Sequence, residues 1–112
     1  TENLAPNMCN VPLPAGTRGD GFREVVSEVW LPRLREYAPQ MVFISAGFDA
    51  HYEDDMASLG LVEADYTWIT GVIQRAARAS ASGRIISSLE GGYELTALAR
   101  SAEAHLRALS GL

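Results

Sequence analysis

Two short apolar runs, each followed by a turn and a helix-like pattern, constrain the fold of this chain most strongly. MVFISAG (41–47) is too short for a helix and shows no polar alternation, and RIISSLE (84–90) is a second run of the buried type. Such runs are typical of parallel strands that are covered on both faces. Apolar residues at helical spacing follow at 63–79 and from Leu95 to Leu109. We therefore predict two buried parallel strands, each followed by a helix.

The first forty residues add one more strand and one more helix to this pattern. CNVPLP (9–14) is short, apolar and closed by prolines, which suits a strand at a sheet edge or the end of a strand. Helical spacing runs from Phe22 to Tyr37, and Pro32 inside it predicts a kink or a helix end near Leu31. The predicted order is β-α-β-α-β-α, an α/β fold with right-handed crossovers and a parallel sheet. In such sheets ligands bind beyond the carboxyl ends of the strands.

Composition excludes several classes of function. With 112 residues, 47% of them hydrophobic, the chain fits one modest domain or a piece of a larger one. The net charge of −5 comes from 14 acidic and 9 basic residues, so a nucleic-acid partner is not expected. No apolar stretch approaches the roughly 20 residues that span a bilayer, so no membrane partner is expected. Cys9, the only cysteine, excludes an internal disulfide and fits a reducing compartment, for which we predict the cytoplasm.

The opening residues TENLAPNMCN lack the basic and apolar regions of a signal peptide. They also lack an initiating Met, which indicates that the chain begins partway through a longer protein.

Acidic and imidazole side chains follow the first buried strand, in the stretch SAGFDAHYEDD (45–55). Asp49 is well placed to bind a cation such as Zn²⁺, Mg²⁺ or Mn²⁺, although a loop acid bonded to backbone amides is the simpler interpretation of one carboxylate. In extended chain His51 would point the same way as Asp49 and could be a second ligand. Because the segment is turning, a supporting role for His51 is the alternative. Glu53, Asp54 and Asp55 are interpreted as a solvated acidic loop, in which an Asp could cap a helical turn.

A tyrosine follows two glycines at the end of the second buried strand. Gly91 and Gly92 permit a tight turn and close backbone approach, so Tyr93 can project into a pocket. Its hydroxyl could donate a hydrogen bond to a developing oxyanion, and the alternative is a ring packed in the core. Glu90 is a candidate supporting residue that, with Glu94, could attract a cationic substrate. The position of Glu94 at a helix N-terminus offers a second explanation for its charge.

Four sequence blocks in order, taken together, resemble a known pattern. NVPLPAG (10–16), LPRL (31–34), ISAGFDAH (44–51) and LEGGYEL (89–95) resemble the C-terminal third of the histone deacetylase superfamily. The likeness is greatest to its class II-like bacterial branch, which includes acetylpolyamine amidohydrolases and acetoin-utilisation-type proteins. We interpret residues 1–112 as the C-terminal part of a single deacetylase domain. The resemblance implies the three-layer, parallel-sheet fold of the arginase–deacetylase type and zinc-dependent hydrolysis of N-acetyl amides.

The resemblance also implies roles for individual residues. Asp49 matches a zinc-binding aspartate, and Tyr93 matches the tyrosine that stabilises the tetrahedral intermediate. Gly91 and Gly92 match the glycine loop that lines the acyl-lysine channel. His51 lies in a matching block, but the family does not use it as a zinc ligand, so it remains a supporting residue. The implied cofactor is Zn²⁺, and the implied substrate is acetylated lysine or an acetylated polyamine.

The family's other zinc ligands, an Asp-x-His pair, and its catalytic His pair lie upstream of Thr1. We therefore expect the chain alone to be inactive and to expose apolar surface where the missing strands belong, which would favour a homo-oligomer. One alternative is an arginase-like dimanganese ureohydrolase, in which Asp-x-Asp follows the same strand; His51 and the GGY turn disfavour it. A second alternative is a non-catalytic fragment of the same fold.

Overall fold

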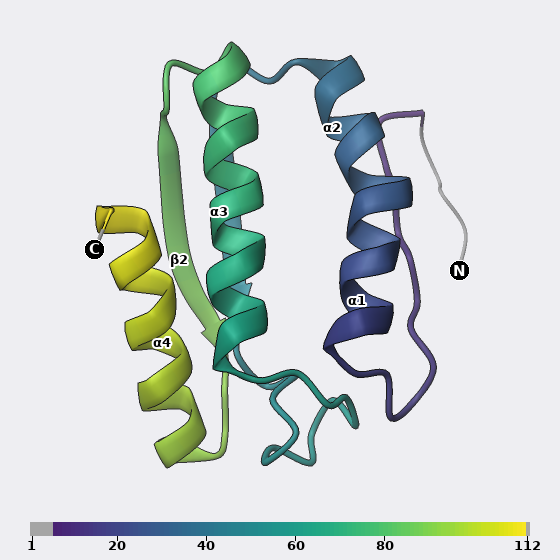
Figure 1. Cartoon of the computed structure of the whole chain (residues 1–112), viewed down its shortest axis with the longest axis vertical. Helices are drawn as coiled ribbons and strands as arrows, with labels where there is room; N and C mark the ends of the chain where they lie inside the picture. Colours follow the sequence, from purple (N-terminus) through teal and green to yellow (C-terminus); the bar gives the residue numbers. More distant parts are fainter. Residues whose placement is uncertain (1–5, 112) are drawn as a thin grey trace.

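Two parallel strands form the sheet of the structure, a computed structural model that describes residues 6–111 (Figure 1). Strand β1 (Val42–Gly47) pairs with β2 (Ile85–Gly91), and each leads into a helix, α3 (Glu63–Ser80) or α4 (Leu95–Ser110). The predicted α/β class, the parallel pairing and these four elements are confirmed. The prediction that residues 1–10 are not a signal peptide falls partly outside the described residues, because these do not include residues 1–5.

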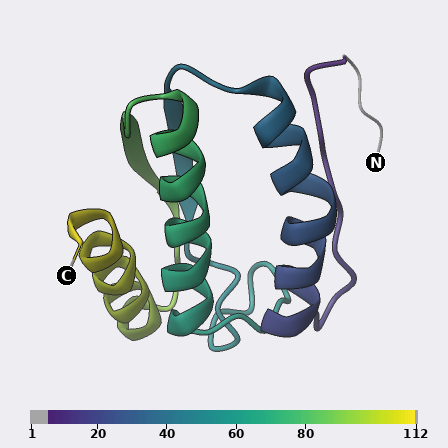
Figure 2. The same cartoon turned by 45° about the horizontal axis from the view of Figure 1, so that its top comes forward.

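The prediction of a strand at 9–14 is wrong, and the predicted order β-α-β-α-β-α is therefore wrong in its first element. These residues have no regular secondary structure, and the observed order is helix, strand, helix, strand, helix. The segment runs alongside the helix at residues 19–37 (Figure 2). Arg33 holds it there, with Nη2 donating to the carbonyl of Pro6 over 2.9 Å. The prolines of the segment lack the N–H groups that a sheet ladder needs.

The first helix is continuous through its proline. An α-helical part, α1 (Gly19–Val25), passes into one π-helical stretch, η1 (Val26–Trp30), and then into α2 (Leu31–Tyr37). In a regular α-helix the ring of Pro32 would clash with the carbonyl of Glu28, four residues earlier. That carbonyl lies in the wider π-helical stretch, where the hydrogen bonding already departs from the α pattern. The insertion explains why Pro32 does not end the helix.

Helices α3 and α4 cover one face of the two-stranded sheet. His105 of α4 makes 2.8 Å hydrogen bonds to Thr70 of α3 and to Ser87 of β2, and so joins the three elements. On the opposite face, Phe43 is 71% exposed and Ile86 is 50% exposed. The prediction that both faces of the strands are covered is therefore wrong for the part of the chain that the structure describes. The exposed apolar face agrees with the expectation that further elements belong there.

The main cluster of buried hydrophobic residues lies around the carboxyl end of β1. Ala46, Phe48, Leu61 and Tyr66 form its buried centre, and the rings of Phe48 and Tyr66 are 5.1 Å apart. The core therefore supports the loops that leave the carboxyl ends of the strands. Among the described residues, no helix combines the length and apolar character needed to cross a membrane.

Candidate functional site

The loops that follow the two strands meet at one end of the sheet, as the parallel topology predicts (Figure 1). Gly47 of β1 lies opposite Gly91 of β2, and the Phe48 N–H donates to the Gly91 carbonyl over 2.8 Å. The register shifts between Ala46 and Gly47, so that Glu90 is the extra residue on β2. Such irregularities redirect the side chains that follow them. The β1–α3 loop and the short β2–α4 connection thus form one rim.

The carboxylate of Asp49 lies against two glycines, one from each strand. A Cβ atom at Gly47 or at Gly91 would lie 3.2 Å from Asp49 Oδ1, closer than most side chains tolerate. Within residues 6–111 this carboxylate accepts no hydrogen bond. The interpretation of Asp49 as a loop acid bonded to backbone amides therefore has no support in the described residues. Its oxygens accept no hydrogen bond from the described residues and lie against Gly47 and Gly91, which together form a glycine cradle.

Tyr66 adds a buried, unpaired hydroxyl close to this carboxylate. The residue is 7% exposed, and its hydroxyl has no hydrogen-bond partner among the described residues. Burial raises the pKa of Tyr66, and the nearby negative charge of Asp49 raises it further. The phenol therefore stays protonated as a potential donor. Sequence periodicity places Tyr66 on the buried face of its helix, but it carries no signal of this neighbour.

His51 belongs to the scaffold of the loop. The residue is fully buried, and its Nδ1 accepts a hydrogen bond from the backbone N–H of Glu53 over 3.1 Å. Because Nδ1 accepts, the proton resides on Nε2, which donates to the carboxylate of Glu63. With both ring nitrogens engaged inside the protein, neither is free for a metal ion.

A charged network connects this histidine to the helices behind it. Arg100 of α4 donates to Glu63 over 3.0 Å and to Glu53 over 2.5 Å. The hydrogen bond from His51, supported by Arg100, lowers the pKa of Glu63 to about 2. Glu53, interpreted from the sequence as a solvated loop acid, is therefore paired. The network joins the β1–α3 loop to the start of α3 and to α4.

Asp54 is buried between the two loops, so its interpretation as part of a solvated acidic loop is wrong. It is 4% exposed, and its Oδ1 accepts the Met56 N–H over 3.0 Å. Its Oδ2 accepts the backbone N–H groups of Tyr93 and Glu94 over 2.7 and 3.0 Å. The Met56 bond lowers the pKa of Asp54 most, burial opposes it, and the Tyr93 and Glu94 bonds lower it further.

The β2–α4 connection has the conformation that its glycines permit. Gly92 has a φ of +146°, and a Cβ atom there would lie 2.7 Å from Leu98 Cδ1. Tyr93 is 60% exposed, which excludes the alternative of a ring packed in the core of the described residues. Glu94 caps α4, because its Oε1 accepts the N–H groups of the first helical turn at 2.8 and 3.2 Å. Glu90 is exposed at the rim.

The described residues offer one ligand position for a metal ion. Within residues 6–111 no group of three or more His, Cys, Asp or Glu side chains could hold an ion. The uncommitted carboxylate of Asp49 in its glycine cradle suits a single oxygen ligand to a divalent cation. The donor set fits a metal centre whose other ligands are contributed from outside these residues.

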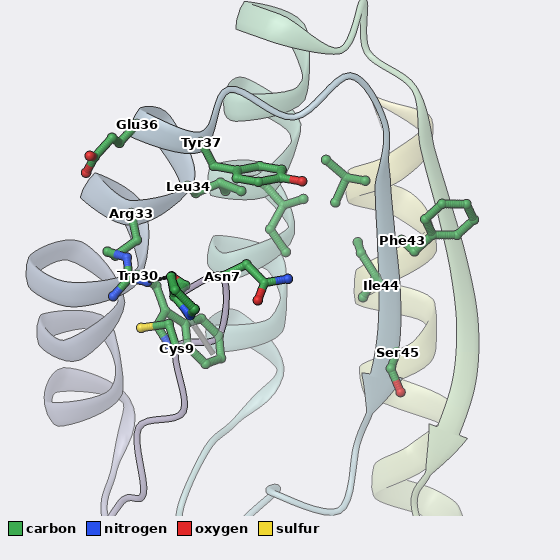
Figure 3. A pocket seen from close by; sticks show the side chains of 13 residues that line it. Asn7, Cys9, Trp30, Arg33, Leu34, Glu36, Tyr37, Phe43, Ile44 and Ser45 are labelled. Carbon is green, nitrogen blue, oxygen red and sulfur yellow. Dashed lines mark hydrogen bonds between the residues drawn. The ribbon is translucent and has the colours of Figure 1, made fainter. Parts of the chain in front are cut away.

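A large cavity of about 1090 Å³ lies elsewhere, between α2 and β1 (Figure 3). Trp30, Leu34 and Tyr37 approach it from the helix, and Ile44 and Ser45 belong to the strand beside it. Its lining is largely apolar, and it contains none of the predicted site residues. The cavity is a gap between the helix and the open edge of β1, separate from the rim.

Comparisons with known proteins identify the family of this sequence. The sequence matches the histone deacetylase domain over residues 1–109. It is 42% identical over 108 residues to type-2 histone deacetylase 1 of Dictyostelium discoideum, covering 96% of this chain and 7% of that protein. It is 33% identical over 84 residues to a histone deacetylase-like amidohydrolase of Pseudomonas aeruginosa, covering 75% and 22%.

A solved structure, that of the histone deacetylase Clr3, is similar with a TM-score of 0.80 and 31% identity. That match covers 88% of this chain and 16% of the Clr3 chain. This chain therefore spans less than a quarter of each of these three proteins.

Proposed function

This chain belongs to the histone deacetylase family, and we propose that the complete protein is a zinc-dependent deacetylase that hydrolyses N-acetyl amides. The observation that carries the proposal is the meeting of Asp49 and the GGY turn at one rim. Asp49 Oδ1 lies within 3.2 Å of where a Cβ atom at Gly91 would be, two residues before Tyr93. A ligand bound at the carboxyl ends of these strands would lie next to both loops.

Asp49 is the residue of this chain that would hold the zinc ion, through a carboxylate that accepts no other hydrogen bond in the described residues. A bound zinc ion supplies a Lewis acid that polarises the amide carbonyl and lowers the pKa of a bound water. The remaining ligands and the proton-transferring histidines would come from other parts of the complete protein. His51, Glu63 and Arg100 would keep the loop that carries Asp49 in place.

Tyr93 would stabilise the charge that develops on the amide oxygen. A phenol hydroxyl can donate a hydrogen bond to that oxygen, and such donors are most effective when they are already oriented before the reaction. The exposed side chain of Tyr93 leaves it accessible to a substrate. Gly91 and Gly92 would let the acyl chain of the substrate approach the backbone closely.

The proposed substrates are acetylated lysine side chains or acetylated polyamines. Both carry an acetyl amide on an alkyl amine chain, and a polyamine also carries positive charge. Glu90, exposed at the rim, would attract such a charge. Comparing acetate release from an acetyl-lysine peptide and from an acetylpolyamine would decide between these classes.

The metal role is tested in the complete protein by the metal content of the purified Asp49→Ala variant. We expect stoichiometric zinc in the wild type and its loss in the variant. Asp55→Ala is the matched control, because Asp55 is an exposed acid of the same loop. Stoichiometric zinc in the Asp49 variant would refute the role of Asp49 as a ligand.

The role of Tyr93 is tested by acetate release from an acetyl-lysine peptide. Tyr93→Phe should lower kcat by roughly 10²–10³-fold, the usual cost of removing one oxyanion donor. Tyr37→Phe is the control, because Tyr37 is also an exposed tyrosine, at the end of α2. Equal rates in the two variants would contradict the assignment. Urea release with two Mn²⁺ per protein would support the ureohydrolase alternative instead.

A further inference from the structure

We propose that Asp54 is a positioning residue for Tyr93, which it orients through the backbone on both sides of that tyrosine. This inference rests on the proposed function, because it concerns how the oxyanion donor is held. Asp54 itself is buried and touches the backbone of the β2–α4 connection. It would therefore act through Tyr93 and not through direct contact with a substrate.

The geometry of the contact supports orientation of the side chain. A single oxygen, Oδ2 of Asp54, accepts the N–H of Tyr93 over 2.7 Å and the N–H of Glu94 over 3.0 Å. These two amides belong to the peptide groups on either side of the Tyr93 Cα atom. Anchoring both groups limits the φ and ψ rotations of Tyr93, and these rotations set the direction of its Cα–Cβ bond. The side chain of Tyr93 is exposed, but the backbone that carries it is thus restrained.

The restraint is needed because Gly92 is a flexible position. Glycine accepts a wide range of backbone angles, so by itself it would let the following residue move. Its φ of +146° is a conformation that other residues rarely adopt. The carboxylate of Asp54 selects one conformation by holding the two amides that follow. Gly92 permits the turn, and Asp54 makes it rigid.

The charge of Asp54 matters as well as its shape. An ionised carboxylate only accepts hydrogen bonds, and bonds to it are stronger than those between neutral groups. Asp54 accepts three backbone N–H groups and, among the described residues, has no arginine partner. An asparagine of the same shape would present an N–H₂ group to one of these donors. Asp54→Asn therefore disturbs the contact with little change in volume.

Asp54 also couples the two halves of the proposed site. It lies five residues after Asp49 in the β1–α3 loop, while the amides that it binds belong to the β2–α4 connection. A shift of either loop would change the position of the oxyanion donor relative to the metal ligand. Misplacement by about 1 Å can cost roughly 100-fold in rate.

The test is a double-mutant cycle on the complete protein, with acetate release from an acetyl-lysine peptide as the assay. Asp54→Asn alone should lower kcat by roughly 10- to 100-fold with a smaller change in KM. The same change in a Tyr93→Phe background should cost less than about twofold, because the hydroxyl that it positions is absent. Asp55→Asn, an exposed neighbour with the same chemical change, is the matched control and should leave kcat unchanged.

Each outcome of this experiment decides a different claim. Equal losses from Asp54→Asn in both backgrounds, or loss of bound zinc from that variant, would overturn the positioning role and indicate a general effect on the loop. A silent Tyr93→Phe would refute the role of Tyr93 as the oxyanion donor, and a wild type without deacetylase activity would refute the proposed function itself. If Asp54→Asn does not fold, hydrogen exchange of the wild type decides, and rapid exchange of the Tyr93 and Glu94 amides would overturn the inference.

Discussion

Replacing Gly92 with alanine should destabilise the protein and disturb the loop that carries Tyr93. Two separate effects contribute, and both can be read from the structure. The backbone at Gly92 has a φ of +146°, where an alanine is strained. The added methyl group would also lie 2.7 Å from Leu98 Cδ1 and 3.4 Å from Phe48 Cβ.

The magnitude follows from these two effects. Backbone strain at such an angle costs about 1–3 kcal/mol, and overpacking costs about 1–3 kcal/mol. The end of Leu98 can rotate away, but Leu98 packs against the core cluster, so the rotation gives up contacts there. Because the end of Leu98 can move, we expect a decrease in the free energy of unfolding of roughly 2–4 kcal/mol, in the lower half of the combined range of about 2–6 kcal/mol.

Gly83→Ala separates the two effects. Gly83 also has a positive φ, +75°, but a Cβ atom there would meet nothing within 4 Å. Alanine at that position should cost only about 1–2 kcal/mol from the backbone. Urea unfolding of the complete protein, followed by circular dichroism, measures both variants. If Gly92→Ala were no more destabilising than Gly83→Ala, the close packing of the turn against Leu98 would be refuted.

Two further predictions concern pH, and both are checked by urea unfolding midpoints between pH 3 and pH 8. Burial lowers the pKa of His105 below its usual 6.5, so the unfolded chain takes up a proton first and stability should fall as the pH drops through about 6.5; His105→Gln should remove this slope. The hydrogen bond with His51 lowers the pKa of Glu63 from 4.5 to about 2, so its stabilisation should be complete above pH 4.5 and lost as the pH falls toward 2. Glu63→Gln should remove this acid sensitivity, whereas Glu103→Gln, in an exposed pair on α4, should retain it.

The central elements could be predicted from the sequence because their signal is local. A continuous apolar run at 41–47 and helical spacing at 63–79 each reflect burial of one segment, whatever its neighbours are. Parallel pairing then follows from the alternation of strands and helices, and it brings GFDAH and GGY to one rim. The prediction of a strand at 9–14 was wrong because an apolar segment joins a sheet only where a neighbouring strand lies beside it and its own N–H groups are available.

The role of Asp54 could not be predicted, because its partners carry no side-chain signature. It lies in the acidic stretch YEDD, which has the composition of a solvated loop. Its partners are backbone amides 39 and 40 residues away, and any residue except proline supplies such an amide. Only the folded chain distinguishes the buried Asp54 from its exposed neighbour Asp55.

The pairing of the other acids around the rim supports the proposal that Asp49 is the ligand of this chain. Glu53 and Glu63 are paired with Arg100, and Asp54 is satisfied by backbone amides. Asp49 accepts no hydrogen bond in the described residues and lies where β1 ends. In the described sheet β1 pairs on one side only, with β2. A further parallel strand on its open edge, beside the cavity of Figure 3, would end at the same rim as β1, and we propose that the remaining ligands of the metal centre come from there.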